Sequence, residues 1–60
     1  MSVSQPQRDR IVEKLEVAKN ALEEAANLLK SAGESGMHDE ILLLHHMAAA
    51  EIEGVRKLAP

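Results

Sequence analysis

Three histidines are the residues of this chain best suited to binding a metal or moving a proton: His38, His45 and His46. A helix presents two metal ligands on one side when they are three or four residues apart. His38 and His45 are seven residues apart, or about 10 Å along a helix axis, and His45 and His46 project about 100° apart. Every residue three or four positions from His45 or His46 is Ile, Leu or Ala. We therefore expect no cofactor and no metal site within one chain, and a metal-binding bundle would need ligands from a second copy.

The same histidines allow a second hypothesis, that the protein senses pH. Histidine titrates near neutral pH, and His45 lies at the edge of an apolar stripe, where its protonation would disturb an interface. This hypothesis predicts that the mass of the oligomer falls between about pH 7.5 and pH 5.5. The plainer interpretation is that His45 is a partly buried interface residue and His46 a solvated one. A pH or metal function through His45 and His38 remains an alternative.

Catalytic motifs are missing from the sequence. No Glu is followed three residues later by His, which is the pattern that holds iron in carboxylate bundles. The chain has no Cys to act as a nucleophile, no glycine-rich phosphate loop and no serine in a nucleophile elbow. We therefore predict that the protein is not an enzyme.

The chain must build its core from aliphatic side chains alone. Its 60 residues are 45% hydrophobic, include no aromatic residue and no Cys, and carry a net charge of −3. A domain this short usually needs oligomerisation or very regular helix packing, and the negative charge argues against general nucleic-acid binding. The N-terminus lacks the apolar region of a secretory signal, and no apolar run approaches the ~20 residues of a membrane span. We therefore expect a soluble, cytoplasmic protein.

Capping and turn residues divide the chain into two helices. Ser4 and Gln7 have the spacing of a capping box. Gly33 suits the left-handed position that ends a helix, and Ser35 is a candidate N-cap for the helix that follows. The single domain 1–60 is accordingly predicted to contain a flexible N-terminus at 1–4, a helix at about 5–32, a turn at 33–36 and a helix at about 36–59.

Apolar stripes along both segments predict an antiparallel hairpin completed by a second copy. The first stripe alternates large and small residues at a 4-3 spacing, which allows close antiparallel packing. Because a lone hairpin leaves the outer sides of its helices uncovered, we predict an all-α four-helix bundle formed by a homodimer, with a tetramer as an alternative. The residues predicted at this interface are Ile11, Leu15, Ala18, Leu22, Ala25, Leu29, Ile41, Leu44, Ala48, Ile52 and Val55.

The alternation of leucines with Ala18 and Ala25 in a short hairpin resembles the Rop family, a small dimeric bundle that binds pairs of RNA loops. The resemblance covers the packing pattern. It implies an RNA-binding alternative, in which Arg8, Lys19 and Lys30 supply a basic edge at eleven-residue spacing. The RNA-binding face of that family is built around an aromatic residue, which this chain lacks, and acidic residues dilute the basic edge.

The leading functional prediction comes from apolar residues that a hairpin does not need. Leu42 and Leu43 project away from the stripe of the second helix, toward its polar side, where a two-helix hairpin could not cover them. With Met47 and His46 they form a predicted partner-binding patch, and methionine suits adaptable partner surfaces. We therefore expect a non-catalytic interaction module, a regulator, adaptor or inhibitor that acts as a homo-oligomer on a protein partner.

Overall fold

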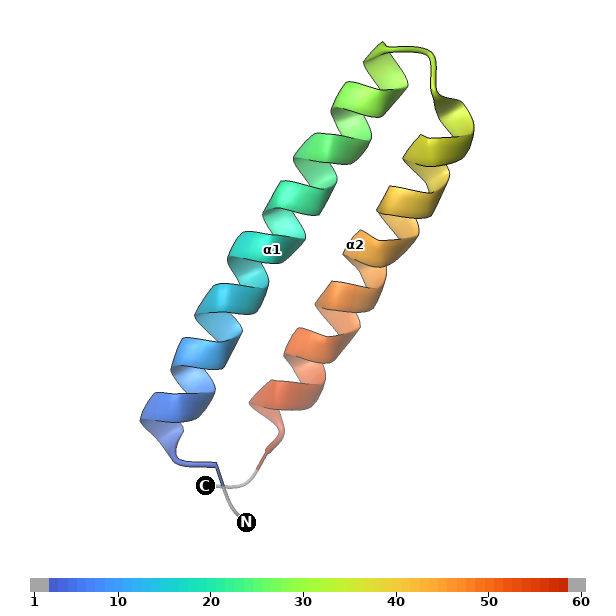
Figure 1. The fold of residues 1–60 in the computed structure, drawn as a ribbon. Coiled ribbons are helices and arrows are strands. Elements are labelled where there is room, and N and C mark those ends of the chain that lie inside the picture. Colours follow the sequence, from blue (N-terminus) through green and yellow to red (C-terminus); the bar gives the residue numbers. More distant parts are fainter. Residues whose placement is uncertain (1–2, 59–60) are drawn as a thin grey trace.

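Two antiparallel helices make up the described structure (Figure 1). The computed structural model describes residues 3–58, with α1 at Gln5–Ser31 and α2 at Ser35–Arg56. The helices lie side by side, with the connecting turn at one end and both chain ends at the other. Their Cα atoms form a rod of 45 × 14 × 12 Å, and residues 3–58 contain no strand. The predicted all-α hairpin is therefore confirmed.

The predicted capping box starts α1. The Ser4 hydroxyl accepts a hydrogen bond from the Gln7 backbone N–H at 3.3 Å, and the Gln7 side-chain oxygen accepts one from the Ser4 N–H at 3.1 Å. Pro6 lies in the first turn, where a backbone N–H would have no partner. Ser4 is thus fixed by the helix that it caps. The rest of the predicted flexible N-terminus includes residues 1–2, which lie outside the described residues.

The turn is closed by backbone hydrogen bonds rather than by a side-chain cap. Gly33 adopts the predicted left-handed conformation, with φ of 81°, and the Glu34 N–H donates to the Leu29 carbonyl at 2.9 Å. This closure makes Glu34 the N-cap of α2 and leaves Ser35 inside the helix, so the N-cap prediction for Ser35 is wrong. The second helix ends at Arg56 instead of residue 59, which lies outside the described residues together with residue 60.

Replacing Gly33 with Ala is expected to destabilise the hairpin, whereas Gly36→Ala is expected to stabilise it. A Cβ atom at either position meets nothing within 4 Å, so only the backbone conformation distinguishes them. A left-handed residue with a side chain costs about 1–2 kcal/mol, while alanine in place of a helical glycine gains about 0.5–1 kcal/mol. Thermal unfolding followed by circular dichroism measures both changes, and equal melting temperatures would contradict this account of the turn.

Side chains between the two helices form a narrow contact that we call the seam. Among residues 3–58 only Ala26 and Ile52 are buried, and the rest of the seam is half-buried. One hairpin therefore makes a seam but not a closed core. The seam residues are Val12, Leu15, Lys19, Leu22, Ala26 and Leu29 in α1, and His38, Ile41, Leu42, His45, Ala48, Ala49, Ile52 and Val55 in α2.

The stripe predicted for the first helix and the seam share their leucines but differ in the residues between them. The sequence favoured a row through Ile11 and Ala18, whereas the seam uses Val12 and Lys19, each one residue later. The aliphatic stem of a lysine can lie along an apolar contact while its ammonium group reaches water. A hydropathy pattern therefore does not predict that Lys19 lies in the seam.

Candidate interaction surface

The row displaced from the seam lies uncovered on one side of the hairpin. In α1, Ile11 is 41% exposed, Ala18 is exposed and Ala25 is half-buried; in α2, Met37 and Leu44 are 56% and 45% exposed. Each of these residues comes one position before a seam residue. Because antiparallel helices are related by an approximate two-fold axis, the same offset turns both rows to the same side. We call this side the open face; its apolar residues are Ile11, Ala18, Ala25, Met37 and Leu44.

The opposite side of the hairpin carries charged pairs. Arg56 Nη2 lies 2.6 Å from Glu16 Oε1, and Arg56 Nη1 lies 3.4 Å from Glu53 Oε1. The Arg56 and Glu16 side chains are 51% and 43% exposed, so solvent screening limits their pair to less than about 1 kcal/mol. The sequence did not suggest this pair, because it joins different helices and depends on how they align. The ion pairs of Arg56 and the apolar row of the open face therefore lie on opposite sides of the hairpin.

His45 is held between the helices. Its side chain is only 12% exposed, its Nε2 lies 3.3 Å from Glu23 Oε2, and its Nδ1 lies 2.9 Å from the carbonyl oxygen of Lys19. A carbonyl oxygen only accepts hydrogen bonds, so Nδ1 carries a proton in this contact. The doubly protonated ring donates to both acceptors, whereas the neutral ring donates to one of them. His45 therefore joins α1 and α2 within one subunit.

The other two histidines do not complete a metal site with His45. His38 Nδ1 lies 3.0 Å from Oδ1 of the neighbouring Asp39. The exposed ring of His46 packs edge-on against that of His45, with ring centroids 5.3 Å apart. Among residues 3–58 no three His, Asp or Glu side chains gather where they could hold a metal ion. The arrangement gives no support to the metal-binding alternative.

The predicted partner-binding patch lies only partly on the surface. Leu42 is half-buried in the seam, which is two residues wide at this level, so the expectation that a hairpin leaves it uncovered is wrong. Leu43 and Met47 are 60% and 55% exposed, and their four-residue spacing places both on the side of α2 that faces away from α1. We call these two residues the outer ridge, and the exposed His46 lies beside it.

The predicted basic edge is partly used within the hairpin. Arg8 Nη1 donates to the Leu58 carbonyl oxygen at 2.6 Å, Lys19 is half-buried in the seam, and Lys30 is exposed. Nucleic-acid binding relies on several free cations along one surface. The arrangement therefore does not favour the RNA-binding alternative.

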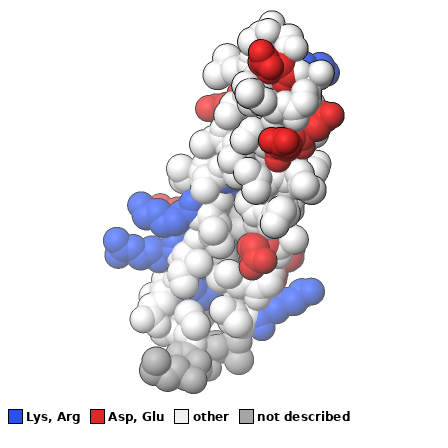
Figure 2. Space-filling model, turned by 45° about the vertical axis from the view of Figure 1, so that its right-hand side comes forward, with Lys and Arg blue, Asp and Glu red and all other residues white. Residues whose placement is uncertain are grey.

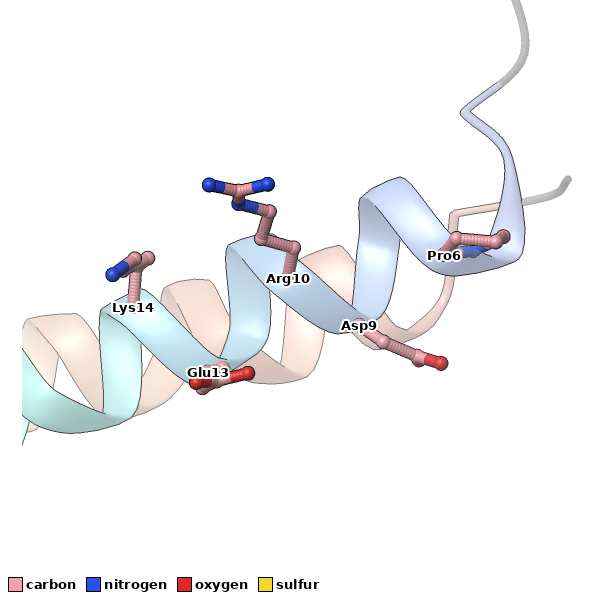
Figure 3. A pocket seen from close by; sticks show the side chains of 5 residues that line it. All are labelled: Pro6, Asp9, Arg10, Glu13 and Lys14. Carbon is pink, nitrogen blue, oxygen red and sulfur yellow. The ribbon is translucent and has the colours of Figure 1, made fainter.

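Two surface hollows are lined by residues of α1 alone. One hollow is lined by Pro6, Asp9, Arg10, Glu13 and Lys14 (Figure 3). Arg10 and Lys14 extend from one side of the helix and Asp9 and Glu13 from another. A second hollow also belongs to α1 alone. The basic and the acidic side chains of the first hollow therefore do not converge on one point.

The residues predicted at the bundle interface separate into two groups. Ile11, Ala18 and Leu44 are exposed on the open face, and Ala25 is half-buried at its edge. The predicted bundle interface therefore includes both residues that pack within the hairpin and residues that stay exposed. The members that lie in the seam are Leu15, Leu22, Leu29, Ile41, Ala48, Ile52 and Val55.

Comparisons of the chain with protein families, with curated proteins and with solved structures found no match. Within residues 3–58, neither helix combines the length and the apolar character needed to cross a membrane.

Proposed function

We propose that this protein is a non-catalytic interaction module that acts as a homo-oligomer. A second copy covers the open face and completes a four-helix bundle, and the outer ridge stays free for a protein partner that the module regulates, inhibits or links to others. The observation that carries this proposal is an uncovered apolar row extending over both helices, with Ile11, Met37 and Leu44 each more than 40% exposed. Contiguous apolar surfaces of this kind mark interaction sites.

The exposed area of the hairpin supports self-association. The chain exposes 4588 Å² of surface, whereas a compact monomer of 6.5 kDa exposes about 3,800 Å². The excess is roughly 800 Å², which is about what each partner buries in a stable protein interface. The radius of gyration of 14.1 Å also exceeds the roughly 10 Å expected for a compact domain of this length. A second copy on the open face would cover the excess surface and would bring the radius of gyration closer to that expected for the number of residues.

The outer ridge is tested by replacing Leu43 and Met47 with glutamate in the same chain. We expect the oligomer mass to stay unchanged, because both residues point away from the seam and are not on the open face. We expect proteins captured from a host extract by the immobilised chain, and identified by mass spectrometry, to be lost. Val17→Glu is a matched control, because Val17 is 65% exposed on α1 and should keep the capture. Capture that survives in the ridge variant would contradict the partner-binding role.

A further inference from the structure

We propose that the second copy docks with its turn at the same end of the bundle, so that α1 of each subunit faces α2 of the other. This orientation rests on the self-association proposed above. The two-fold axis then runs parallel to the helices, between the two open faces. Rotation about such an axis leaves the height of every residue along the bundle unchanged. The hairpin itself therefore shows which residues lie level across the interface.

Two contacts across the seam fix these heights. Arg8 reaches the carbonyl oxygen of Leu58 near the chain ends, and His45 contacts Glu23 nearer the turn. Because the helices are antiparallel, seven residues forward along α1 correspond to seven residues backward along α2. Moving seven residues, or two helical turns, along each helix from either pair gives the heights of the other residues.

The sizes of the side chains on the open face favour turns at the same end. Its α1 row contains Ile11, Ala18 and Ala25, and its α2 row contains Met37 and Leu44. Leu44 lies level with residues 22–24, within one helical turn of Ala25. Facing α1 against α2 of the partner subunit therefore sets a large side chain beside a small one. The opposite orientation would pair α1 with α1 and α2 with α2. Ala18 would then face Ala18 of the partner subunit near the middle of the bundle, and Leu44 would face α2 of the partner subunit instead of its Ala25. Only Ile11 would then face a small residue, Ala25 of the partner subunit.

Charge on the open face favours the same orientation. Lys14 and Glu51 come one position before a seam residue, as the rest of the open face does, and both are exposed. Neither forms an ion pair within residues 3–58, and Figure 3 shows Lys14 directed away from Glu13. Glu51 lies level with residues 15–17, within one helical turn of Lys14. With the turns together, each Glu51 meets the Lys14 of the partner subunit; with the turns opposed, the two Glu51 carboxylates approach each other near the middle of the bundle.

Acidic residues near the turn do not outweigh these contacts. Figure 2 shows Asp and Glu side chains gathered toward the turn end of the visible face, and residues 19–48 hold two basic and five acidic residues, a net charge of −3. These carboxylates are directed to water: Glu23 is 57% exposed and Asp39 is 79% exposed. Repulsion between exposed charges is screened beyond about 8 Å at physiological ionic strength. Contacts within the open face therefore decide the orientation.

The orientation is tested by the distance between spin labels near the turn. The chain has no Cys, so Ser31→Cys provides a single labelling site per subunit for pulsed electron double resonance. Turns at the same end predict a separation below about 25 Å, since neighbouring helix axes are about 8–10 Å apart. Turns at opposite ends predict about 40 Å, which is the length spanned by the 27 residues of α1. A label at Asn20→Cys, near the middle of α1, is the control and should give a short distance in either orientation.

Three outcomes of these measurements distinguish the subunit orientation from self-association itself. A dimer mass with a short distance at Ser31→Cys supports the orientation. A dimer mass with labels about 40 Å apart overturns the orientation and leaves self-association standing. A light-scattering mass of one chain overturns both.

A charge exchange tests the contact between Lys14 and Glu51 of the partner subunit. Lys14→Glu and Glu51→Lys are each expected to weaken the dimer roughly tenfold, because each change turns two symmetric attractions into repulsions. The two changes in one chain restore the attraction and are expected to restore the dissociation constant. A double variant that dimerises more weakly than both single variants would contradict the contact.

Discussion

Replacing Ile11 and Leu44 together with glutamate is expected to convert the proposed dimer into a monomer. Full burial of a large aliphatic side chain contributes about 1.5–3 kcal/mol, and these residues are 41% and 45% exposed in the hairpin. Covering them should therefore contribute about 1 kcal/mol each. Each substitution occurs twice in a dimer, so the loss is about 4 kcal/mol, or roughly a thousandfold in the dissociation constant. Burial of the new carboxylates would add to this loss.

The same variant should also lose cooperative unfolding, because the isolated hairpin buries only Ala26 and Ile52 among residues 3–58. Light scattering measures the mass, and far-ultraviolet circular dichroism measures the helix content. The matched control replaces Asn20 and Asn27 with glutamate, which adds the same charge to exposed positions of α1 away from the open face. If this control dissociated as fully as the variant, added charge rather than the open face would be the cause.

Replacing His45 with Ala is expected to lower the free energy of unfolding by about 1–3 kcal/mol, because it removes a ring that is hydrogen-bonded across the seam and leaves its partners unpaired. These partners are the Lys19 carbonyl oxygen, 2.9 Å from Nδ1, and the Glu23 carboxylate, 3.3 Å from Nε2. In a chain of this length the change corresponds to a fall in melting temperature of roughly 5–20 °C. Thermal unfolding at a fixed protein concentration measures it.

His46→Ala is the matched control for this prediction. His46 is the next residue along α2 and its side chain is exposed, so its replacement should change stability by less than about 0.5 kcal/mol. Glu23→Gln separates the two interactions of His45, because it leaves the Lys19 carbonyl in place, and it should have a smaller effect than His45→Ala. If His45→Ala and His46→Ala lowered the melting temperature equally, His45 would not join the helices as described.

The helices could be predicted because their ends are set by local signals. Ser4 and Gln7 form both hydrogen bonds of the capping box, and Gly33 has the positive φ that ends a helix before a turn. Each of these features involves residues only a few positions apart. The prediction failed at Ser35, where backbone hydrogen bonds that close the turn compete with the side-chain cap and displace the helix start by one residue.

The seam could not be predicted in the same way, because adjacent rows on α1 both contain apolar residues. The alignment of the helices decides between them, and it places Lys19 and Leu42 in the seam while leaving Ile11 and Leu44 exposed. The ion pair of Arg56 depends on that alignment too. The sequence therefore indicated that apolar residues stay exposed, but the hairpin was needed to show that they lie on the open face and on the outer ridge.

The mass of the chain in solution shows whether the hairpin associates with a second copy. Sedimentation equilibrium is measured at neutral pH and physiological ionic strength over a range of concentrations. The mass should be twice the 6.5 kDa of one chain at high concentration and should fall toward 6.5 kDa on dilution. The open face is then covered by a second copy. A mass of 6.5 kDa at every concentration, together with a fully helical circular dichroism spectrum, would show that the hairpin is stable alone and would contradict the account.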